Sequence, residues 1–573
     1  MSPYASHIGA ELIRFSDTDR KRILRALDLA VTAHGSQKRA SGEPFVMHPI
    51  SIATRIARVG LDADTVIAAL LHDIIEDCDI PAVQIEKEFG APVRFLVESV
   101  SKLGHIRYSA EQRKVESLRR MFLAIARDIR VVIIKLYDRL HNMETLRHLP
   151  QDKQEKIAKE TLELYAPLAY RLGFGELKGQ LEDYAFPVLY PEEYKWVVGA
   201  VEEKKAEREK YLKKIMRRLE QELEREHVPV IDINTRAKHY YSLWKKLLKY
   251  DMNIERIHDL SAVRVIVGDV ADCYTVLGII HKLWKPLPGR IKDYIALPKP
   301  NGYRSIHSTV IAEDERVIEV QIRTKAMHDE AENGVAAHWA YEAAGKSSHA
   351  RAEVSESQLI EQLREWQKHF TSASSEDFVE ALKIDFFQDR IFTLTPRGDV
   401  VDLPDGATPI DFAYQIHSDI GNRMTGAKVN GKLVNFQHKL KSGDNVEILT
   451  QKGKKPSSDW ISFARTSVAR EHIRTALRRS GVRLPNPMHL KPGKQSIEIS
   501  VKGANRKGLL KDISSVFSES SINIERHNSE PIDASTSLIH FTITHYAGGR
   551  LEKLLTRIRA VPDVIAVSYE KNA

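Results

Sequence analysis

The hydrophobic pattern of the chain changes once, near Val228, and this change limits the fold more than any other feature. Before it, apolar residues recur at helical spacing, as in Thr18–His34, Ile50–Val59 and Asp62–Asp77. After it, short β-rich runs such as VPVIDI, SAVRVIV, DYIAL, SIHSTVI and RVIEVQI alternate with helical stretches. One hydrophobic core rarely organises 573 residues. We therefore expect an all-helical first domain, followed by smaller domains that contain sheets.

Turn signals and linker-like stretches divide the later part of the chain. GKSSHARAEVSES and TSASS have linker composition, and the turns TPRGD, VNGK and KSGD separate short strands in a pattern typical of a small β-grasp-like module. The last segment has the order strand, helix, two strands, helix, strand, which predicts a ferredoxin-like domain. The expected regions are a helical domain at 1–180, an α/β domain at 181–345, a helical linker at 346–384, the β-grasp-like module at 385–450, a second helical linker at 451–494 and the ferredoxin-like domain at 495–573.

Composition excludes several classes of protein. No stretch has the apolar run of about 20 residues that spans a bilayer, and the N-terminus does not have an export-signal pattern, so we expect a cytoplasmic protein. Cys78 and Cys273 are the only cysteines, which is too few for a cysteine-rich zinc module, so a bound metal must use His and carboxylate ligands. The net charge of +8 favours anionic partners such as nucleotides or RNA, although a basic surface that aids solubility explains it equally well.

The first domain contains a set of residues suited to a divalent metal. His48, His72, Asp73 and Asp138 lie in or beside apolar helical stretches, where an unpaired carboxylate is costly. Two imidazoles and two carboxylates suit a borderline ion such as Mn²⁺ and leave positions for water and a phosphate oxygen. Taken singly, each residue is better explained by packing or by an arginine partner. Together they predict a metal-dependent phosphohydrolase site.

The string HDIIED, residues 72–77, is expected to lie on one helix. That would place Glu76 on the same face as His72, and Asp77 on the same face as Asp73. In KLYDRLHNMETL, Asn142 follows Asp138 by one helical turn.

These strings, together with RASGEPFVMHP, resemble the HD hydrolase domain of the RelA/SpoT homologues, the (p)ppGpp synthetase/hydrolases, and the resemblance continues over nearly the whole chain. It implies release of pyrophosphate from the 3′ position of ppGpp or pppGpp. It also implies that His48, His72, Asp73 and Asp138 hold Mn²⁺. Glu76 and Asp77 would position or activate the attacking water, and Arg39 and Asn142 would bind the nucleotide. Ala40 stands where many relatives have a second basic residue.

The α/β domain is rich in basic residues but has no Walker-type glycine loop. Spacing alone fits an anion or RNA site as readily as an enzyme. LSAVRVIV, RIKDYIALPKPNGYRSIHSTV, EVQIRT and GVAAHWAY, however, resemble the synthetase domain of the same family, which implies a nucleotidyltransferase-like α/β fold.

In that resemblance Asp259 and Glu319 would bind Mg²⁺, and Glu319 would also act as the base for the 3′-hydroxyl of GDP or GTP. Tyr303 would stack on guanine, the alternative being an ordinary half-buried strand aromatic. The remaining implied contacts are Arg236 and Arg264 with the adenine of ATP; Lys238, Lys292 and Lys299 with its phosphates; and His307 and Gln321 in the same pocket.

RIKD, residues 290–293, matches the basic form of this motif found in bifunctional members, so both activities are expected. Thr235, Ala237 and Arg304 depart from the usual residues, and they motivate an alternative in which the chain is a hydrolase with a degenerate, regulatory synthetase domain.

The C-terminal strings resemble TGS and ACT domains. In relatives a histidine matching His417 meets the acceptor end of tRNA on the ribosome; a polar residue at a helix end is the other interpretation. The chain is short between these two modules and has no cysteine-rich module there, which argues against ribosome-dependent activation. The basic charge balance and the TGS-like module leave a second alternative, a non-catalytic binder of tRNA or the ribosome. The sequence leaves the oligomeric state open, a homo-oligomer included.

Overall fold

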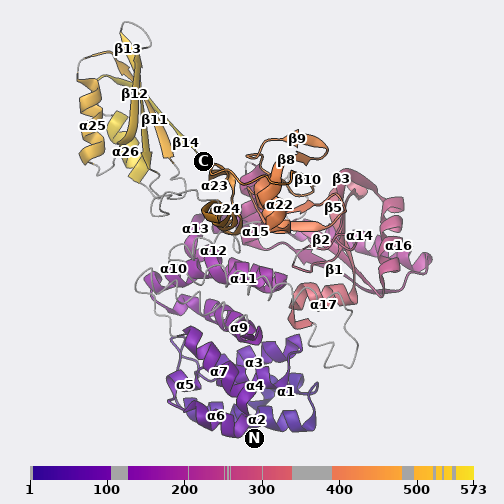
Figure 1. Cartoon of the computed structure of the whole chain (residues 1–573). Helices are drawn as coiled ribbons and strands as arrows, with labels where there is room; N and C mark the ends of the chain where they lie inside the picture. Colours follow the sequence, from indigo (N-terminus) through magenta and orange to yellow (C-terminus); the bar gives the residue numbers. More distant parts are fainter. Residues whose placement is uncertain are drawn as a thin grey trace. The chain divides into compact units, whose positions relative to one another are not determined.

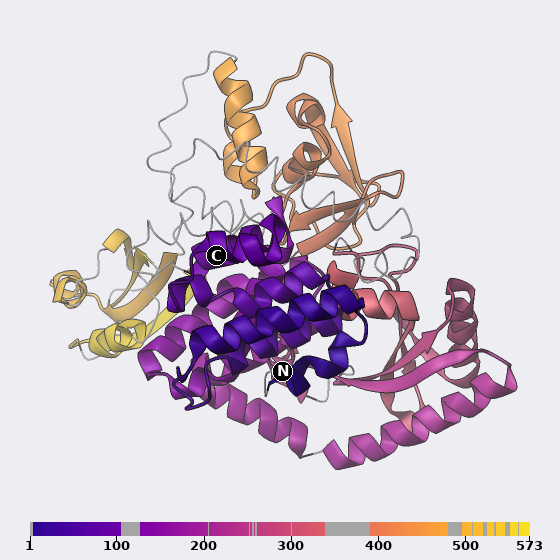
Figure 2. The same ribbon diagram turned by 90° about the horizontal axis from the view of Figure 1, so that it is seen from below.

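The first third of the chain forms a bundle of helices around one apolar core, as its helical spacing predicts (Figures 1 and 2). Its helices have polar caps where the sequence supplies them: the side chain of Ser16 accepts a hydrogen bond from the backbone of Asp19, and that of Asp62 from the backbone of Thr65. The helices are α1 (Ala5–Leu12), α2 (Asp17–His34), α3 (Met47–Val59), α4 (Ala63–Leu71), α5 (Ile74–Asp77), α6 (Ala82–Phe89), α7 (Ala91–Gly104), α9 (Arg130–Glu144), α10 (Gln151–Glu160), α11 (Ala166–Arg171) and α12 (Gly175–Leu189).

The expectation that residues 72–77 lie on one helix is wrong. α4 ends at Leu71 and α5 begins at Ile74, so His72 and Asp73 lie at the junction between two helices. The imidazole Nδ1 of His72 bonds the carbonyl of Ala69 at 2.9 Å. In a continuous helix that carbonyl would accept from the backbone N–H of Asp73. The junction directs both side chains toward α3 and α9.

Helix α12 contributes to two hydrophobic cores. Leu177 and Leu181 lie in the core of the helical bundle. Phe186, on the same helix, packs with Leu243 and Trp244 in a separate aromatic core. This core also includes residues of the next helix, α13 (Pro191–Glu202). The helix after it, α14 (Lys205–Arg225), packs in the core of the α/β domain. The helical bundle and the α/β domain are therefore joined by a shared helix.

The α/β domain is built on the mixed five-stranded sheet that the sequence predicts, with strand order β1-β2-β5-β4-β3. β2 and β5 are parallel, with Arg264 opposite Gln321, and the other neighbouring strands are antiparallel. Its elements are β1 (Val230–Ala237), α15 (Tyr240–Leu247), β2 (Ser261–Val267), α16 (Val270–Leu283), β3 (Lys285–Asp293), β4 (Ile306–Ile311), β5 (Val317–Thr324) and α17 (Lys325–Asn333).

DYIAL, predicted as a strand, lies instead in a turn that follows β3. The carboxylate of Asp293 accepts hydrogen bonds from the backbone N–H groups of Ile295 and Ala296, both at 2.9 Å. Such a side-chain-to-backbone turn ends a strand. The strand itself lies over the preceding residues, which include Pro286, and the register with β4 is irregular between Pro286 and Ile291.

The β-grasp-like module has a two-stranded and a three-stranded sheet packed with one helix, and two further helices follow it. The carboxylate of Asp411 accepts from the backbone N–H groups of Arg465 and Thr466, which ties the following helices to the module. The elements are β6 (Arg390–Leu394), β7 (Val400–Pro404), α21 (Pro409–Ile416), α22 (Ser418–Arg423), β8 (Met424–Val429), β9 (Lys432–Val434), β10 (Val446–Thr450), α23 (Trp460–Phe463) and α24 (Ser467–Arg479).

The final segment has the predicted ferredoxin-like order, with an antiparallel sheet β12-β13-β11-β14 and helices that pack on one apolar core. It forms a compact unit, Arg483–Ala573, separate from Met1–Val482. Its elements are β11 (Ser496–Ala504), α25 (Leu509–Glu519), β12 (Ile524–Pro531), β13 (Thr536–Thr544), α26 (Arg550–Arg559) and β14 (Val564–Asn572).

The structure, a computed structural model, describes most of the chain. In the residues it describes, no helix has both the length and the apolar character that crossing a membrane requires. The predicted linker at 346–384 and residues 480–494 of the second predicted linker lie outside these residues, and the predicted domain boundaries stay predictions. The described residues are 4–104, 127–203, 205–250, 252–254, 257, 260–299, 301–337, 390–479, 496–506, 508–519, 524–531, 535–544, 550–559 and 561–572.

Candidate active sites

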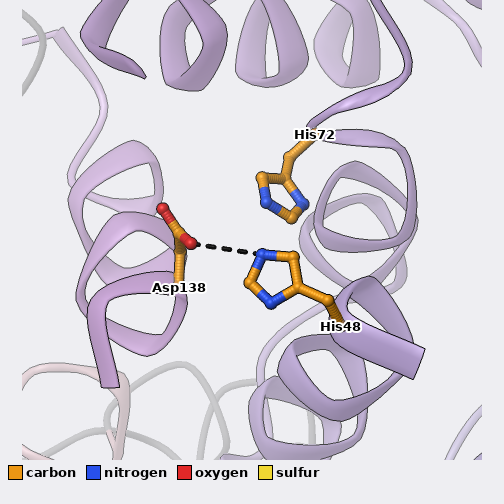
Figure 3. A group of neighbouring side chains, drawn as sticks. All are labelled: His48, His72 and Asp138. Carbon is orange, nitrogen blue, oxygen red and sulfur yellow. Dashed lines mark ion pairs between the residues drawn. The ribbon is translucent and has the colours of Figure 1, made fainter. Parts of the chain in front are cut away.

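The four residues predicted to hold a metal converge in the helical bundle. His48 comes from the first turn of α3, Asp138 from α9, and His72 and Asp73 from the junction between α4 and α5. Ligand atoms of His48, His72 and Asp138 all lie within 4.8 Å of one another, and Figure 3 shows these side chains pointing toward a common centre. Asp73 closes the group, because its carboxylate lies 3.1 Å from Nε2 of His72 and 3.6 Å from Nε2 of His48.

His72 is prepared to bind a cation. Since its Nδ1 bonds the carbonyl of Ala69, the proton is placed on Nδ1 and the lone pair of Nε2 faces the cluster. Within the described residues Nε2 is buried and makes no hydrogen bond, but a carboxylate oxygen of Asp73 lies 3.1 Å from it and, against the effect of burial, raises the pKa of His72 to about 9. A buried imidazole beside two carboxylates therefore carries either a proton or a bound cation on Nε2. The donor set of two imidazoles and two carboxylates therefore fits a divalent cation.

The carboxylates of the cluster are held in their charged form. Burial alone would raise the pKa of Asp138, but the ammonium of Lys135, 2.6 Å away, and the neighbouring imidazoles keep it well below its usual range. For Asp73, burial is likewise outweighed by the charges of His72 and His48, which lower its pKa to about 2. Both groups can thus act as anionic ligands at neutral pH.

Arg39 lies against this cluster, as expected for a substrate-binding residue. Its guanidinium donates to Nδ1 of His141 at 2.7 Å, to Nδ1 of His48 at 3.0 Å and to the amide oxygen of Asn142 at 2.5 Å. Asn142 in turn donates to the carboxylate of Asp138 at 2.6 Å. Arg39 and Asn142 are therefore brought together with the metal-site residues into one hydrogen-bonded network.

Glu76 and Asp77 lie on the short helix α5, directly after the metal-site junction. The side chain of Asp77 is exposed, while Glu76 is half-buried. Although the residue is exposed, partial desolvation of its carboxylate and the nearby charge of Asp73 raise the pKa of Asp77, which is the direction expected for a group that accepts a proton. The roles of these two residues stay predictions.

In the α/β domain, four predicted residues form one hydrogen-bonded string across the sheet. The hydroxyl of Tyr303 lies 2.8 Å from Nε2 of His307, and Nδ1 of His307 lies 3.2 Å from the carboxylate of Glu319. The side-chain amide of Gln321 donates to the same carboxylate at 2.8 Å. Neighbouring β4 and β5 place His307 opposite Gln321. The string therefore holds the carboxylate of Glu319 between the imidazole of His307 and the side-chain amide of Gln321.

Cations surround this string and repel one another. The ammonium of Lys299 lies over the rings of Tyr294 and Tyr303, 4.7 and 5.1 Å from their centroids. Burial, then the charges of Lys292 and Arg236, lowers the pKa of Lys299 to about 8. A bound polyphosphate would relieve this repulsion, so the local charge favours an anionic ligand.

Several buried polar atoms at this site have no partner in the described part of the chain. They are Nε of Arg264, Oε1 of Gln321, and Nε and Nη1 of Arg323. Burial and the charge of Arg323 lower the pKa of Arg264 to about 10. Arg264 and Arg323 share one carboxylate, that of Glu332, at 3.4 and 3.1 Å. A single carboxylate cannot neutralise two guanidinium groups, so a net positive charge remains that an anionic ligand can neutralise.

The remaining synthetase predictions have different outcomes. Asp259 lies outside the described residues, so its predicted Mg²⁺ contact stays a prediction. Lys238 follows β1, and its backbone N–H donates to the carbonyl of Leu260 at 3.2 Å. Thr235 sits in regular β1 opposite Val263, a conformation that does not need glycine. Arg304 donates to both carboxylate oxygens of Glu330 at 2.7 Å, which anchors the loop after Tyr303 to α17.

Comparison with known proteins decides between an isolated likeness and common descent. The chain is 45% identical over 479 residues to guanosine-3′,5′-bis(diphosphate) 3′-pyrophosphohydrolase of Aquifex aeolicus, an alignment that covers 83% of this chain and 67% of that protein. The chain belongs to the RelA/SpoT family. It is 43% identical to the bifunctional (p)ppGpp synthase/hydrolase SpoT of Escherichia coli and to GTP pyrophosphokinase of Myxococcus xanthus, covering 80% of this chain and 65% and 60% of those proteins.

Four families match successive parts of this RelA/SpoT chain. Residues 26–175 match the HD domain and residues 235–346 the region found in RelA and SpoT proteins; residues 390–450 match the TGS domain and residues 491–568 the ACT domain. This confirms the predicted domain types. The chain spans between 60% and 67% of the length of the three relatives compared.

Sequence reasoning missed three residues that belong to the sites of this RelA/SpoT chain. Lys135 and His141 each lie three residues from Asp138 on α9, so helical spacing could have indicated them. Arg323 shares a face of β5 with Glu319 and Gln321, which strand alternation could have indicated.

His417, predicted in the TGS domain, caps α22. Its Nδ1 accepts a hydrogen bond from the backbone N–H of Asp419 at 3.1 Å, and the side chain is 64% exposed. In the structure, His417 therefore acts as the N-terminal cap of α22, the second of the two interpretations. This contact uses Nδ1 and leaves Nε2 available to solvent.

Proposed function

We propose that this RelA/SpoT-family enzyme makes and destroys (p)ppGpp at two separate sites. In one reaction water and (p)ppGpp give GDP or GTP plus pyrophosphate. In the other, the 3′-hydroxyl of GDP or GTP receives the pyrophosphoryl group of ATP, with AMP as the second product. The observation that carries the first half is the convergence of His48, His72, Asp73 and Asp138, with the buried Nε2 of His72 facing the carboxylate of Asp73.

At the hydrolase site, the four cluster residues would hold Mn²⁺, which supplies a Lewis acid for the phosphate and lowers the pKa of water. Arg39 binds the phosphates once it leaves the imidazoles, and Asn142 keeps the carboxylate of Asp138 oriented. Asp77, with its raised pKa, accepts the proton of the attacking water, and Glu76 orients that water. The bond that breaks joins the 3′-oxygen to phosphorus, and the 3′-oxygen leaves with a proton.

At the synthetase site, Glu319 takes the proton of the 3′-hydroxyl, which then attacks the β-phosphorus of ATP while the bond to the α-phosphate breaks. His307 and Gln321 hold the carboxylate in place from two sides. Arg236 and Arg264 face the adenine, Lys238, Lys292 and Lys299 the phosphates, and Tyr303 the guanine. Glu319 and Asp259 would hold Mg²⁺, which neutralises charge on the transferred group.

A paired assay tests both halves. Purified protein is incubated with labelled ppGpp and Mn²⁺, and separately with ATP, GDP and Mg²⁺, and the products are separated by chromatography. We expect pyrophosphate and GDP in the first case, and ppGpp and AMP in the second. Intact ppGpp after incubation with Mn²⁺ would contradict the hydrolase half.

The alternative of a degenerate synthetase domain is tested in the same way with an Asp73→Ala protein, which cannot remove its own product. Formation of ppGpp by this variant refutes that alternative, and its absence, with hydrolysis intact in the wild type, supports it. Thr235 in a regular strand and Arg304 anchored to Glu330 both favour a working site.

A tRNA contact is a second candidate function of the TGS domain, supported by the exposed side chain of His417. Replacement of His417 by Ala should then weaken salt-sensitive binding of uncharged tRNA, measured by filter binding, while both assays above remain unchanged. Unchanged binding would exclude this histidine from any such contact.

A further inference from the structure

Helix α12 carries a socket on one of its faces. Glu176, Gly179 and Asp183 are spaced three and four residues apart and therefore lie on the same side of the helix. Glycine inside a helix is about 1 kcal/mol less favourable than alanine, so its place between two carboxylates calls for a reason. We call these three residues the α12 socket.

The ring of His239 occupies the α12 socket. Its Nδ1 lies 2.8 Å from the carboxylate of Asp183 and its Nε2 lies 3.4 Å from that of Glu176. A β-carbon at Gly179 would lie 2.1 Å from the ring, far inside van der Waals contact. The absence of a side chain at Gly179 is therefore what admits His239.

Charge holds the ring in place. Burial disfavours the imidazolium, but hydrogen bonds to Asp183 and Glu176 outweigh it and raise the pKa of His239 to about 9. The hydrogen bond from His239 likewise lowers the pKa of Glu176 to about 2. A cation between two carboxylates, largely shielded from solvent, is a stronger contact than an exposed ion pair.

The socket reaches the segment that carries predicted ATP contacts. His239 directly follows Lys238 and comes three residues after Arg236, whose charge also lowers the pKa of Glu176. The carboxylate of Asp183 accepts, in addition, the backbone N–H of Tyr241 in the first turn of α15, at 3.0 Å. The socket thus holds the part of the turn that enters α15, through the side chain of His239 and the backbone of Tyr241.

Attachment of α12 to the α/β domain does not depend on this contact. Phe186 packs against Tyr241 and Trp244, with ring centroids 5.4 and 5.2 Å apart, in the shared aromatic core. The polar socket therefore contributes something other than attachment: it fixes how the chain that follows β1 enters α15.

We propose that His239, seated in the α12 socket, is a positioning residue for synthesis, which sets Arg236 and Lys238 for the adenine and phosphates of ATP. This inference rests on the proposed synthetase function. Because α12 also belongs to the core of the helical bundle, the residue that orients the ATP-binding segment is seated on the bundle that carries the hydrolase site.

Gly179→Ala tests the proposal with a single methyl group. The substitution favours helix formation but expels the ring of His239, so we expect the KM for ATP in synthesis to rise at least fivefold, with a smaller change in kcat and hydrolysis within twofold of the wild type. Gly199→Ala in α13 and Gly278→Ala in α16 are matched controls, because a β-carbon at either position meets nothing within 4 Å. An unchanged KM for ATP in Gly179→Ala would overturn the proposal.

A double-mutant cycle separates the socket from general damage to α12. In a His239→Ala background the ring no longer occupies the space above Gly179, so adding Gly179→Ala should leave the KM for ATP unchanged and should not lower the melting temperature. A loss of stability from Gly179→Ala that persists in that background, or a loss of hydrolysis with it, would overturn the proposal.

If the wild type makes no ppGpp, the synthetase function fails but the socket remains testable. The same four proteins of the cycle are then compared by calorimetric binding of the β,γ-methylene analogue of ATP. Weaker binding in both single variants, without further loss in the double variant, supports the positioning role; equal binding in all four proteins contradicts it.

Discussion

The two sites differ in the sign of the charge that they are built to receive. In the helical bundle, carboxylates and imidazoles point inward, and their neighbours keep the carboxylates ionised, with the pKa of Asp73 lowered to about 2. In the α/β domain, cations point inward and depress one another, with the pKa of Lys299 lowered to about 8 and that of Arg264 to about 10. The first site fits a metal cation, and the second fits a polyphosphate.

This difference shows that the buried polar atoms without a hydrogen bond indicate the charge of the ligand that each site binds. At the metal site, the buried polar atom without a hydrogen bond among the described residues is Nε2 of His72, which lies beside the carboxylate of Asp73 and carries either a proton or a bound cation. In the α/β domain most such atoms are donors, on Arg264 and Arg323, which require an anion. Each prediction below changes one side of this contrast and leaves the other as an internal control.

Asp138→Asn should have the largest effect. It removes an anionic ligand and leaves the ammonium of Lys135 without its carboxylate, so we expect hydrolysis to fall by about 10²–10³-fold or more and the protein to lose about 3 kcal/mol of stability. Labelled-ppGpp assays and urea unfolding measure these. Asp152→Asn, on the exposed first turn of α10, is the control. Full hydrolysis by Asp138→Asn would refute the metal site.

Glu319→Gln should abolish synthesis selectively. Gln keeps the shape but cannot accept the proton of the 3′-hydroxyl, so we expect ppGpp formation to fall by about 10²–10⁴-fold. Hydrolysis by the same protein should be unchanged. If both activities fell together, the two sites would not be separable and the contrast between them would fail.

The pH dependence of synthesis should follow the depressed pKa of Lys299. The side chain is cationic below pH 8 in the free enzyme and loses its proton above it, so the KM for ATP should rise about tenfold between pH 7 and pH 9. Lys299→Arg keeps its charge over this range and should flatten the profile. Initial rates at several ATP concentrations measure the effect. A wild-type profile as flat as that of the variant would show that this lysine is not at the ATP phosphates.

Arg304→Gln should have the smallest effect. It replaces one of the three residues that depart from the usual pattern and removes a partly exposed ion pair with Glu330, so we expect synthesis to change by less than about threefold. A large gain in synthesis would instead support the degenerate-domain alternative.

Much of the fold follows from local pattern. SAVRVIV forms β2 with the predicted ends, and the helix expected at 18–34 is α2 with one residue added. The failures occur where a side chain competes with the backbone for hydrogen bonds. Asp293 ends β3 and turns the residues of DYIAL, and His72 interrupts the helix expected across HDIIED.

The candidate sites were predictable where residues lie close in sequence and much less so where the fold brings them together. His72 with Asp73 was visible as a pair, whereas the contact of Arg39 with His141, 102 residues away, depends on how α9 packs. Burial of Arg323 depends on α17 covering the end of β5, which no periodicity shows. The string of Tyr303, His307 and Glu319 required the register of two strands.

The sharing of α12 decides where the chain can be cut to study one activity alone. A fragment that stops at residue 175, the end of the HD match, would leave the bundle without Leu177 and Leu181 and expose their apolar partners to water. A fragment that starts after Leu189 would strip Phe186 from Trp244 and uncover aromatic surface. Either truncation should aggregate, so hydrolase and synthetase fragments must each carry their own copy of this helix.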